Sequence, residues 1–83
     1  MDNLEERVIS IICQIGELDK NNITHNSTFE ELNLGSLDAV SIAFEIEDVF
    51  GVEIPDNMVY AISTIQELLD GVKTLVEAKE ASG

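Results

Sequence analysis

Hydrophobic residues recur at intervals of three and four positions in three segments of the chain, as they do along one face of a helix. The first segment, residues 3–15, is followed by Gly16 and carries Leu4, Val8, Ile11, Ile12 and Ile15. The second segment, residues 36–50, contains neither Gly nor Pro and is followed by Gly51, a common residue type at helix ends. These two segments are predicted to be helices.

The third segment follows Ser63 and Thr64, which can cap a helix together with Gln66 and Glu67. Its apolar positions are Ile65, Leu68, Leu69, Val72, Leu75 and Val76. A last long helix is therefore predicted here. We expect the final residues, 78–83, to form a disordered tail.

The connecting segments differ in character. Residues 17–35 are rich in Asn, Thr, Ser and acidic residues, but apolar residues interrupt them irregularly, namely Leu18, Ile23, Phe29, Leu32 and Leu34. This predicts a long loop pinned to the core. Farther along, Pro55 excludes helix at Ile54, and Asp56 can cap a short helical turn that extends through Tyr60.

The predicted fold is an all-α bundle of three long helices and one short helix, with a long loop between the first two. No β-alternation and no internal repeat is visible in the sequence. Eighty-three residues suffice for one domain, residues 1–83. A chain of this length buries too little surface to form a second hydrophobic core. A chain this short can hardly enclose a substrate, which favours a binding or carrying role.

The charge is strongly unbalanced, with 17 acidic residues against four basic ones and a formal net charge of -13. Nucleic acids and anionic membranes repel such a chain, whereas basic protein surfaces attract it. The alternative is that the acidity serves only solubility. Cys13 is the only cysteine, so no intramolecular disulfide forms, and no apolar run of 18 residues appears. We expect a cytoplasmic monomer that does not insert into membranes.

The second predicted helix carries more apolar residues than a core-facing stripe needs. At 100° per residue, one stripe of about 120° faces the core and comprises Ala39, Ile42, Ala43, Ile46, Val49 and Phe50. A polar sector comprises Asp38, Ser41, Glu45 and Asp48. A second apolar ridge, Leu37, Val40 and Phe44, lies away from the core stripe between Glu47 and Asp48. Either the long loop covers this ridge, or the ridge docks a partner with apolar residues ringed by Lys or Arg.

The run from Phe29 to Val40, which contains Gly35-Ser36-Leu37-Asp38, resembles the phosphopantetheine-attachment motif of acyl carrier proteins. Residues 45–56 resemble the acidic helix of that family and the turn after it. The resemblance implies that a phosphopantetheinyl transferase joins 4'-phosphopantetheine from coenzyme A to Ser36, and that its thiol then carries acyl groups as thioesters. It also implies basic partner enzymes that transfer, condense or activate acyl groups in fatty acid, lipid or polyketide biosynthesis.

The resemblance and the apolar ridge together predict a partner-binding face around Ser36, made of Leu37, Asp38, Val40, Ser41, Phe44, Glu47 and Asp48. Two positions depart from the family pattern: Gly35 stands where Asp is usual, and Ser41 where an acid is frequent. Both departures indicate a specialised carrier. The alternative is an acidic adaptor that has lost modification through Gly35 and only binds partners.

An enzyme is not predicted. Ser36 lies in no Gly-x-Ser-x-Gly nucleophile elbow, and the single histidine, His25, is distant from it in the sequence. No Cys, Asp or Glu cluster with zinc-ligand spacing surrounds His25, so no metal site is predicted. Cys13 lies nearly opposite the stripe of the first helix, which predicts partial exposure, and neighbouring acids disfavour its thiolate.

Overall fold

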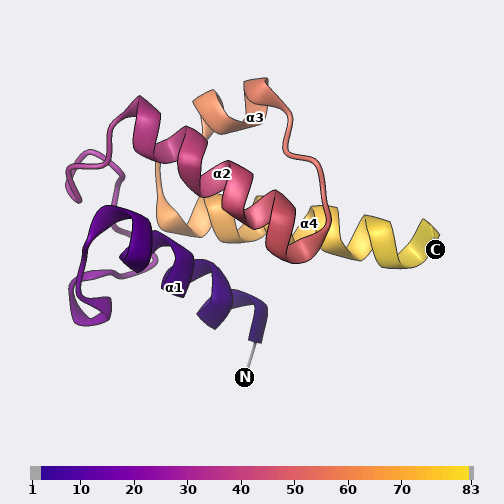
Figure 1. Ribbon diagram of the computed structural model, residues 1–83, viewed down its shortest axis with the longest axis horizontal. Helices are drawn as coiled ribbons and strands as arrows, with labels where there is room; N and C mark the ends of the chain where they lie inside the picture. Colours follow the sequence, from indigo (N-terminus) through magenta and orange to yellow (C-terminus); the bar gives the residue numbers. More distant parts are fainter. Residues whose placement is uncertain (1–2, 83) are drawn as a thin grey trace.

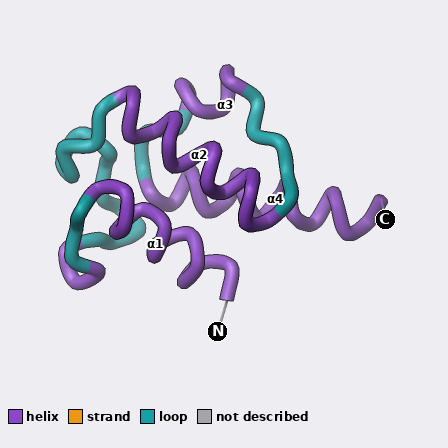
Figure 2. Tube along the Cα trace, in the orientation of Figure 1, coloured by secondary structure: helices purple, strands orange, loops and turns teal. Residues whose placement is uncertain are grey.

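Four α-helices account for most of residues 3–82, the part of the chain that this computed structural model describes. Their bounds are Asn3–Gly16 for α1, Ser36–Phe50 for α2, Asp56–Ala61 for α3 and Ile65–Ser82 for α4; a short 3-10 helix, η1, spans Lys20–Asn22. Figure 1 shows α2 between α1 and α3, with α4 crossing behind them. The all-α fold with a long loop after α1 is confirmed, as the loop in Figure 2 shows.

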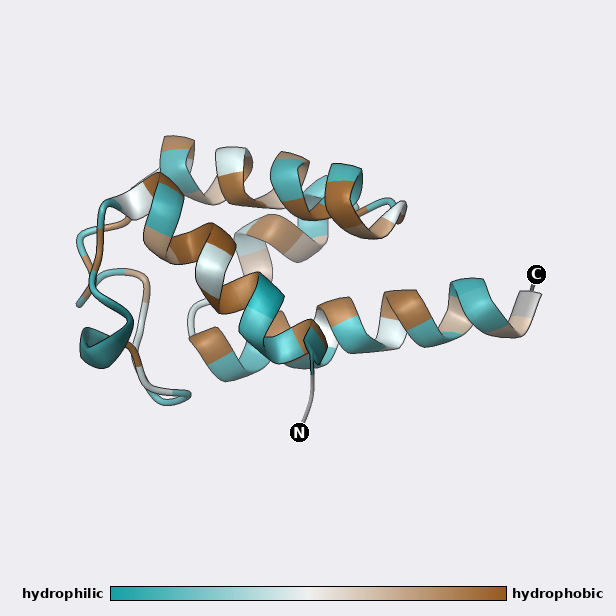
Figure 3. Cartoon of the chain, turned by 60° about the horizontal axis from the view of Figure 1, so that its bottom comes forward, coloured by the Kyte–Doolittle hydropathy of each residue, from teal (hydrophilic) through white to brown (hydrophobic). Residues whose placement is uncertain are grey.

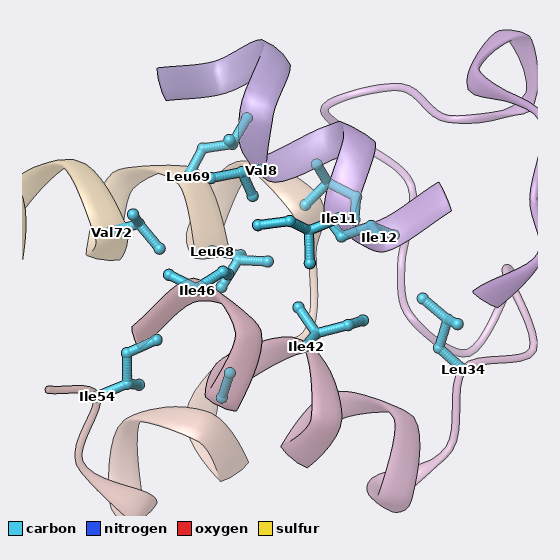
Figure 4. Packing of buried hydrophobic residues seen from close by; sticks show 12 residues of the cluster. Val8, Ile11, Ile12, Leu34, Ile42, Ile46, Ile54, Leu68, Leu69 and Val72 are labelled. Atoms are coloured by element: carbon cyan, nitrogen blue, oxygen red, sulfur yellow. The ribbon is translucent and has the colours of Figure 1, made fainter. Parts of the chain in front are cut away.

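One hydrophobic core holds the helices together. Side chains from three helices converge in it (Figure 4), and the six largest fully buried ones are Val8, Ile12, Ile42, Ile46, Ile65 and Val72. Burying an aliphatic side chain of this size contributes about 1.5–3 kcal/mol. No buried residue in the described part of the chain is polar or charged. In Figure 3, hydrophobic and hydrophilic turns alternate along the long helices, as amphipathic packing around one core requires.

Helix α1 ends one residue later than predicted, and the residue that ends it is Glu17 rather than Gly16. The left-handed residue is Glu17, with φ 53°, and Leu18 N donates to Cys13 O at 2.9 Å, the backbone pattern of a Schellman cap. Gly16 instead allows a close approach, because a Cβ there would lie 2.7 Å from Leu34 Cδ2 and the Leu34 side chain would have to shift. Because Leu34 lies at the end of the long loop, this contact packs the end of the loop against α1.

The long loop is pinned to the core, as predicted. Leu34 is buried, and Leu18, Ile23, Phe29 and Leu32 are half-buried against the same core. Backbone hydrogen bonds also tie the loop to the start of α4: Phe29 N donates to Ser63 O, and Ile65 N donates to Ser27 O, each at 3.0 Å. The loop therefore has a fixed path into the first residue of α2.

The predicted cap of α4 is also confirmed. Thr64 Oγ1 accepts from Glu67 N at 3.1 Å, and Glu67 Oε1 accepts from Ser63 N at 2.8 Å and from Thr64 N at 3.1 Å. The Ser63 hydroxyl donates to the same carboxylate oxygen. Because these donors favour the charged form, they lower the pKa of Glu67, with the Ser63 backbone N–H as the largest cause.

Three details of the predicted helices are wrong. Residues 78–82 continue α4 rather than forming a disordered tail; Gly83 lies outside the described residues. This segment is rich in Ala, Glu and Lys, which are strong helix formers, so nothing stops the helix. Val49 is 36% exposed instead of buried, because it stands at the edge of the core stripe. Asp56 is the first residue of α3 and does not cap it; Pro55 precedes the helix, and its carbonyl accepts from Val59 N.

Candidate functional site

Ser36 is the first residue of α2 and is exposed. Gly35, at the N-cap, has extended backbone angles and no side chain to cap the helix. The first hydrogen bond of the helix joins Ala39 N to Gly35 O at 3.0 Å. The backbone N–H groups of Ser36, Leu37 and Asp38 therefore precede the hydrogen-bonded helix and face its N-terminal end, where the helix dipole favours negative charge.

The carboxylate of Asp38 helps to fix the turn into α2. Its Oδ2 accepts from Gly35 N at 3.2 Å, which is half of a capping box, since glycine offers no reciprocal acceptor. In the described part of the chain, the Ser36 hydroxyl has no hydrogen-bonding partner. The hydrogen bond thus ties the turn to the first turn of α2, while the Ser36 hydroxyl is exposed and makes no competing hydrogen bond within the described residues.

An open groove of about 160 Å³ begins at Ser36 and runs between the start of α2 and α3. Gly35, Ser36 and Ala39 line one side, and Val59, Tyr60 and Ile62 line the other. A Cβ added at Gly35 would meet nothing within 4 Å, so space around the turn is ample. A phosphodiester on Ser36 fits this position, because an anion here meets unpaired N–H groups at a helix N-terminus.

The predicted apolar ridge is open to solvent. Leu37 is 84% exposed and Phe44 is 66% exposed, while Val40 is half-buried. The long loop reaches α3 through Phe29, which lines a groove with Val59 and Ile62, and it leaves Leu37 and Phe44 uncovered. Ser41 is also exposed and contributes no charge to this face. Of the two interpretations of the ridge, covering by the loop is therefore wrong for Leu37 and Phe44.

The acids predicted to surround the ridge have different environments. Glu47 is half-buried, and its Oε2 accepts from Ile54 N at 2.7 Å, so this carboxylate joins α2 to the segment before α3. Asp38 is held by Gly35 N. Asp48, by contrast, is exposed and has no hydrogen-bonding partner in the described residues. Of the three acids in the predicted partner face, Asp48 alone has a free carboxylate.

Tyr60 on α3 extends this face, and the sequence reasoning did not include it. It is 73% exposed and, together with Phe44 of α2, lines a second groove of about 60 Å³. Val40, Glu47, Val59 and Asp56 also line this groove. A single aromatic residue in a six-residue helix creates no periodic pattern, so only the spatial position of α3 reveals it.

The basic residues lie away from these two grooves. The guanidinium of Arg7 stacks over the Phe50 ring, 4.7 Å from its centroid, and Lys79 Nζ donates to Phe50 O at 3.2 Å. Cations at this end of α2 are favoured by its dipole. Lys20 lies in η1 and Lys73 on the exposed side of α4. Among the described residues, no Lys or Arg lines either groove, and the charged residues that line them are the acids Glu47 and Asp56.

Cys13 and His25 lie apart from the site. Cys13 is half-buried, as predicted; burial raises the pKa of its thiol, the nearby Asp19 charge raises it further, and Lys20 opposes them. His25 is in the loop, with Nε2 2.6 Å from Glu5 Oε1. Within residues 3–82, no group of three or more His, Cys, Asp or Glu side chains is placed to hold a metal. None of the described helices has the length and apolarity needed to cross a membrane.

Comparison with known proteins agrees with this geometry. The family model described as "Phosphopantetheine attachment site" matches residues 6–72, which include the Gly35-Ser36 turn, α2, α3 and the first half of α4. The crystal structure of an acyl carrier protein from Thermotoga maritima superimposes with a TM-score of 0.78 at 24% sequence identity, covering 92% of this chain and 94% of that one. The cofactor of such a domain is phosphopantetheine, and the domain itself is not catalytic. The chain belongs to the phosphopantetheine attachment site family of carrier domains.

Proposed function

We propose that this protein is an acyl carrier protein and that Ser36 is its attachment residue. The observation that carries the proposal is the placement of an exposed, unpartnered Ser36 hydroxyl at the uncapped N-terminus of α2, at the mouth of an open groove. The attached group supplies a thiol at the end of a long arm, on which acyl groups are held as thioesters. The chain itself contributes the position of that arm.

Each residue at the turn has a separate task in this proposal. In this transfer the Ser36 oxygen would form a bond to the phosphorus that carries the pantetheine. The pyrophosphate bond of coenzyme A would break, adenosine 3',5'-bisphosphate would leave, and the hydroxyl proton would go to the transferase. The free N–H groups of the first turn of α2 stabilise the resulting anion. Asp38 holds Gly35 N and so keeps the serine at the helix start. The groove toward Ile62 gives the arm a place against the protein.

The partners in this proposal are a phosphopantetheinyl transferase and enzymes that transfer, condense or activate acyl groups through basic docking surfaces. The net charge of -13 and the absence of Lys and Arg from the face around Ser36 support such partners. The predicted partner face remains Leu37, Asp38, Val40, Ser41, Phe44, Glu47 and Asp48. Within it, exposed Leu37, Phe44 and Asp48 are the residues best placed for direct contact.

The replacement of the usual acids by Gly35 and Ser41 supports a specialised carrier within fatty acid, lipid or polyketide biosynthesis. The competing interpretation is an unmodified acidic adaptor, and it is favoured by the same Gly35. One experiment separates the two interpretations. Incubation with coenzyme A and a broad-specificity transferase is expected to add one phosphopantetheine to the intact protein, and Ser36→Ala is expected to abolish the mass increase.

The matched controls for this experiment are Ser41→Ala and Ser63→Ala, which remove exposed hydroxyls elsewhere on the described chain. Both variants should gain the same mass as the unaltered protein. Addition that persists in Ser36→Ala contradicts the assignment of the residue. Failure of the unaltered protein to gain mass with any transferase, or when purified from its source, contradicts the carrier function and leaves the adaptor.

A further inference from the structure

Helix α4 contains a glycine that the backbone does not require. Gly71 lies well inside this helix, where glycine is among the least favourable residues. In the described part of the chain, Gly51 is the glycine with a positive φ, so Gly71 has ordinary helical angles that an alanine could adopt. The reason for a glycine at this position must therefore lie in the space around it.

That space is filled by a side chain of α3. A Cβ at position 71 would overlap the methyl group of Met58, and it would lie 3.7 Å from Met58 Sδ and 4.0 Å from Ile62 Cδ1. Met58 is half-buried, and its unbranched thioether chain is suited to filling an irregular gap. The absence of a side chain at Gly71 thus leaves a notch in α4, and the end of the Met58 side chain occupies it.

Helix α3 has few other attachments. It has six residues, none of them buried, and a helix this short is not stable by itself. Within the described residues, the side chains of α3 form no hydrogen bond with another helix. Met58 and Val59 are the residues of α3 that pack against the core. Apolar packing by these two side chains therefore holds α3 in place, and the notch at Gly71 receives one of them.

The chain is anchored on both sides of α3. Ile54 is only 6% exposed, and its N–H donates to Glu47 Oε2 at 2.7 Å. After α3, Ser63 donates to Glu67 Oε1 from its backbone N–H and from its hydroxyl. Residues 55–62 thus form a short segment between two fixed points, at one edge of the bundle (Figure 1). Local opening of such a segment leaves the three long helices folded.

We propose that Met58 and Gly71 form a latch between α3 and α4, which determines how often α3 opens from the bundle. Because α3 and the residue after it line one side of the groove that begins at Ser36, the latch also sets the width of this groove. None of the described residues of α4 lines the groove, so Gly71 acts on it only through α3. Gly71 and Met58 are therefore positioning residues. The latch is independent of whether Ser36 carries phosphopantetheine.

Amide hydrogen exchange, measured by NMR on the ¹⁵N-labelled protein, tests the latch because it separates local opening from global unfolding. The reporters of α3 are Val59 N and Ile62 N, which donate to Pro55 O and Met58 O. In Gly71→Ala, the new Cβ displaces the Met58 methyl group, so both amides should exchange about threefold to tenfold faster. Amides of α2 should exchange at the same rate or more slowly, because alanine favours the α4 helix.

Met58→Ala removes the other half of the latch. The same two amides should exchange about tenfold faster, because the notch is left empty. Asn57→Ala is the matched control, since Asn57 is the preceding exposed residue of α3 and does not fill the notch. In the double variant of Met58→Ala and Gly71→Ala, the new Cβ has no methyl group to displace. Exchange should therefore be no faster than in Met58→Ala alone, whereas independent effects would multiply.

The groove provides a second measurement. In Gly71→Ala, the amide signals of Gly35, Ser36 and Ala39, which line the α2 side of the groove, are expected to shift. In Lys73→Ala, a control on the exposed side of α4, the same signals should keep their positions. The measurements need neither the arm nor a transferase, so they can be repeated in the Ser36→Ala background.

Faster exchange that is confined to α3, and that does not multiply in the double variant, supports the latch. Three results overturn it: α3 amides that are already unprotected in the unaltered protein, α3 amides that do not respond to Gly71→Ala, or equal acceleration of α2 and α3 amides. Multiplied effects in the double variant overturn it as well. Because exchange and mass increase are measured separately, failure of the latch says nothing against modification of Ser36, and failure of modification says nothing against the latch.

Discussion

Gly35 is the N-cap residue of α2, and it provides no side chain to cap the helix before Ser36. Its φ of -83° and ψ of -174° are extended angles that any residue adopts, and a Cβ there would meet nothing within 4 Å. The glycine is therefore not required by the backbone or by packing. Its effect is to leave the N–H groups at the start of α2 without a side-chain acceptor.

Gly35→Asp is expected to raise the free energy of unfolding by a few tenths of a kcal/mol, because the new carboxylate accepts an N–H of the first turn. It should also speed the modification of Ser36 by a general transferase. Thermal melting and a time course of intact mass measure the two effects. Gly35→Ala is the control, since it adds a Cβ without an acceptor. An equal gain in Gly35→Ala would show that a restricted unfolded chain, not the cap, is responsible.

Single residues were also where the sequence was least informative. The spacing of apolar residues on α2 separated Leu37, Val40 and Phe44 from the core stripe, and the exposure of Leu37 and Phe44 confirms that division. The same spacing placed Val49 in the core, although a residue at the edge of a stripe can face either way. Tyr60 was missed because its importance depends on how α3 packs beside α2.

At the scale of helices, Glu47 links two elements. Its carboxylate accepts from Ile54 N at 2.7 Å, and Ile54 anchors the segment before α3 in the core. We expect Glu47→Ala to cost about 1–2 kcal/mol of stability, because a partly buried backbone N–H loses a charged acceptor. For a domain of this size, the melting temperature should fall by about 4–16 °C.

The matched control for Glu47→Ala is Asp48→Ala, which removes an acid from the next position on α2 but breaks no hydrogen bond in the described structure. Its melting temperature should change little. Glu47→Gln keeps an acceptor oxygen and should recover part of the loss. If Glu47→Ala and Asp48→Ala change the melting temperature equally, Glu47 does not stabilise the link to α3 and is only a surface acid of the partner face, as the sequence suggested.

The helices themselves could be predicted because their ends carry specific residue types. Gly51 takes a left-handed φ of 66° after α2, and Thr64 with Glu67 forms the cap of α4, as their positions in the sequence indicated. The 3-10 turn at Lys20–Asn22 was not predicted, because three polar residues leave no hydrophobic pattern. Likewise, the role of Gly16 follows only from its contact with Leu34, which lies in a different segment.

For the molecule as a whole, the acidic residues are largely unpaired. Within residues 3–82, no Lys or Arg side chain forms a salt bridge with an acid, and the one contact of a carboxylate with a histidine joins Glu5 to His25. Two of the four basic side chains contact Phe50 instead. Like-charge repulsion therefore remains in the folded state. The melting temperature is expected to rise by several degrees on adding salt near neutral pH, because screening reduces this repulsion.

Magnesium chloride and sodium chloride at equal ionic strength provide the comparison for that experiment. Equal rises with the two salts indicate screening alone, and a larger rise with magnesium indicates that clustered acids hold the cation at the surface. A melting temperature that does not respond to either salt would mean that the acids are too dispersed to repel one another. Such a result would also weaken the case for long-range attraction of basic partners.

The half-buried thiol on α1 has a practical consequence for chemical labelling. Burial raises the pKa of Cys13, so little of it is thiolate near neutral pH, and thiolate is the form that attacks maleimides and haloacetamides. A thiol on an arm at Ser36 would stand in water and react first. Brief alkylation would then selectively mark molecules whose arm ends in a free thiol, on a chain that keeps its native cysteine. The carrier could thus be given a fluorophore or spin probe at the end of its arm without mutating Cys13.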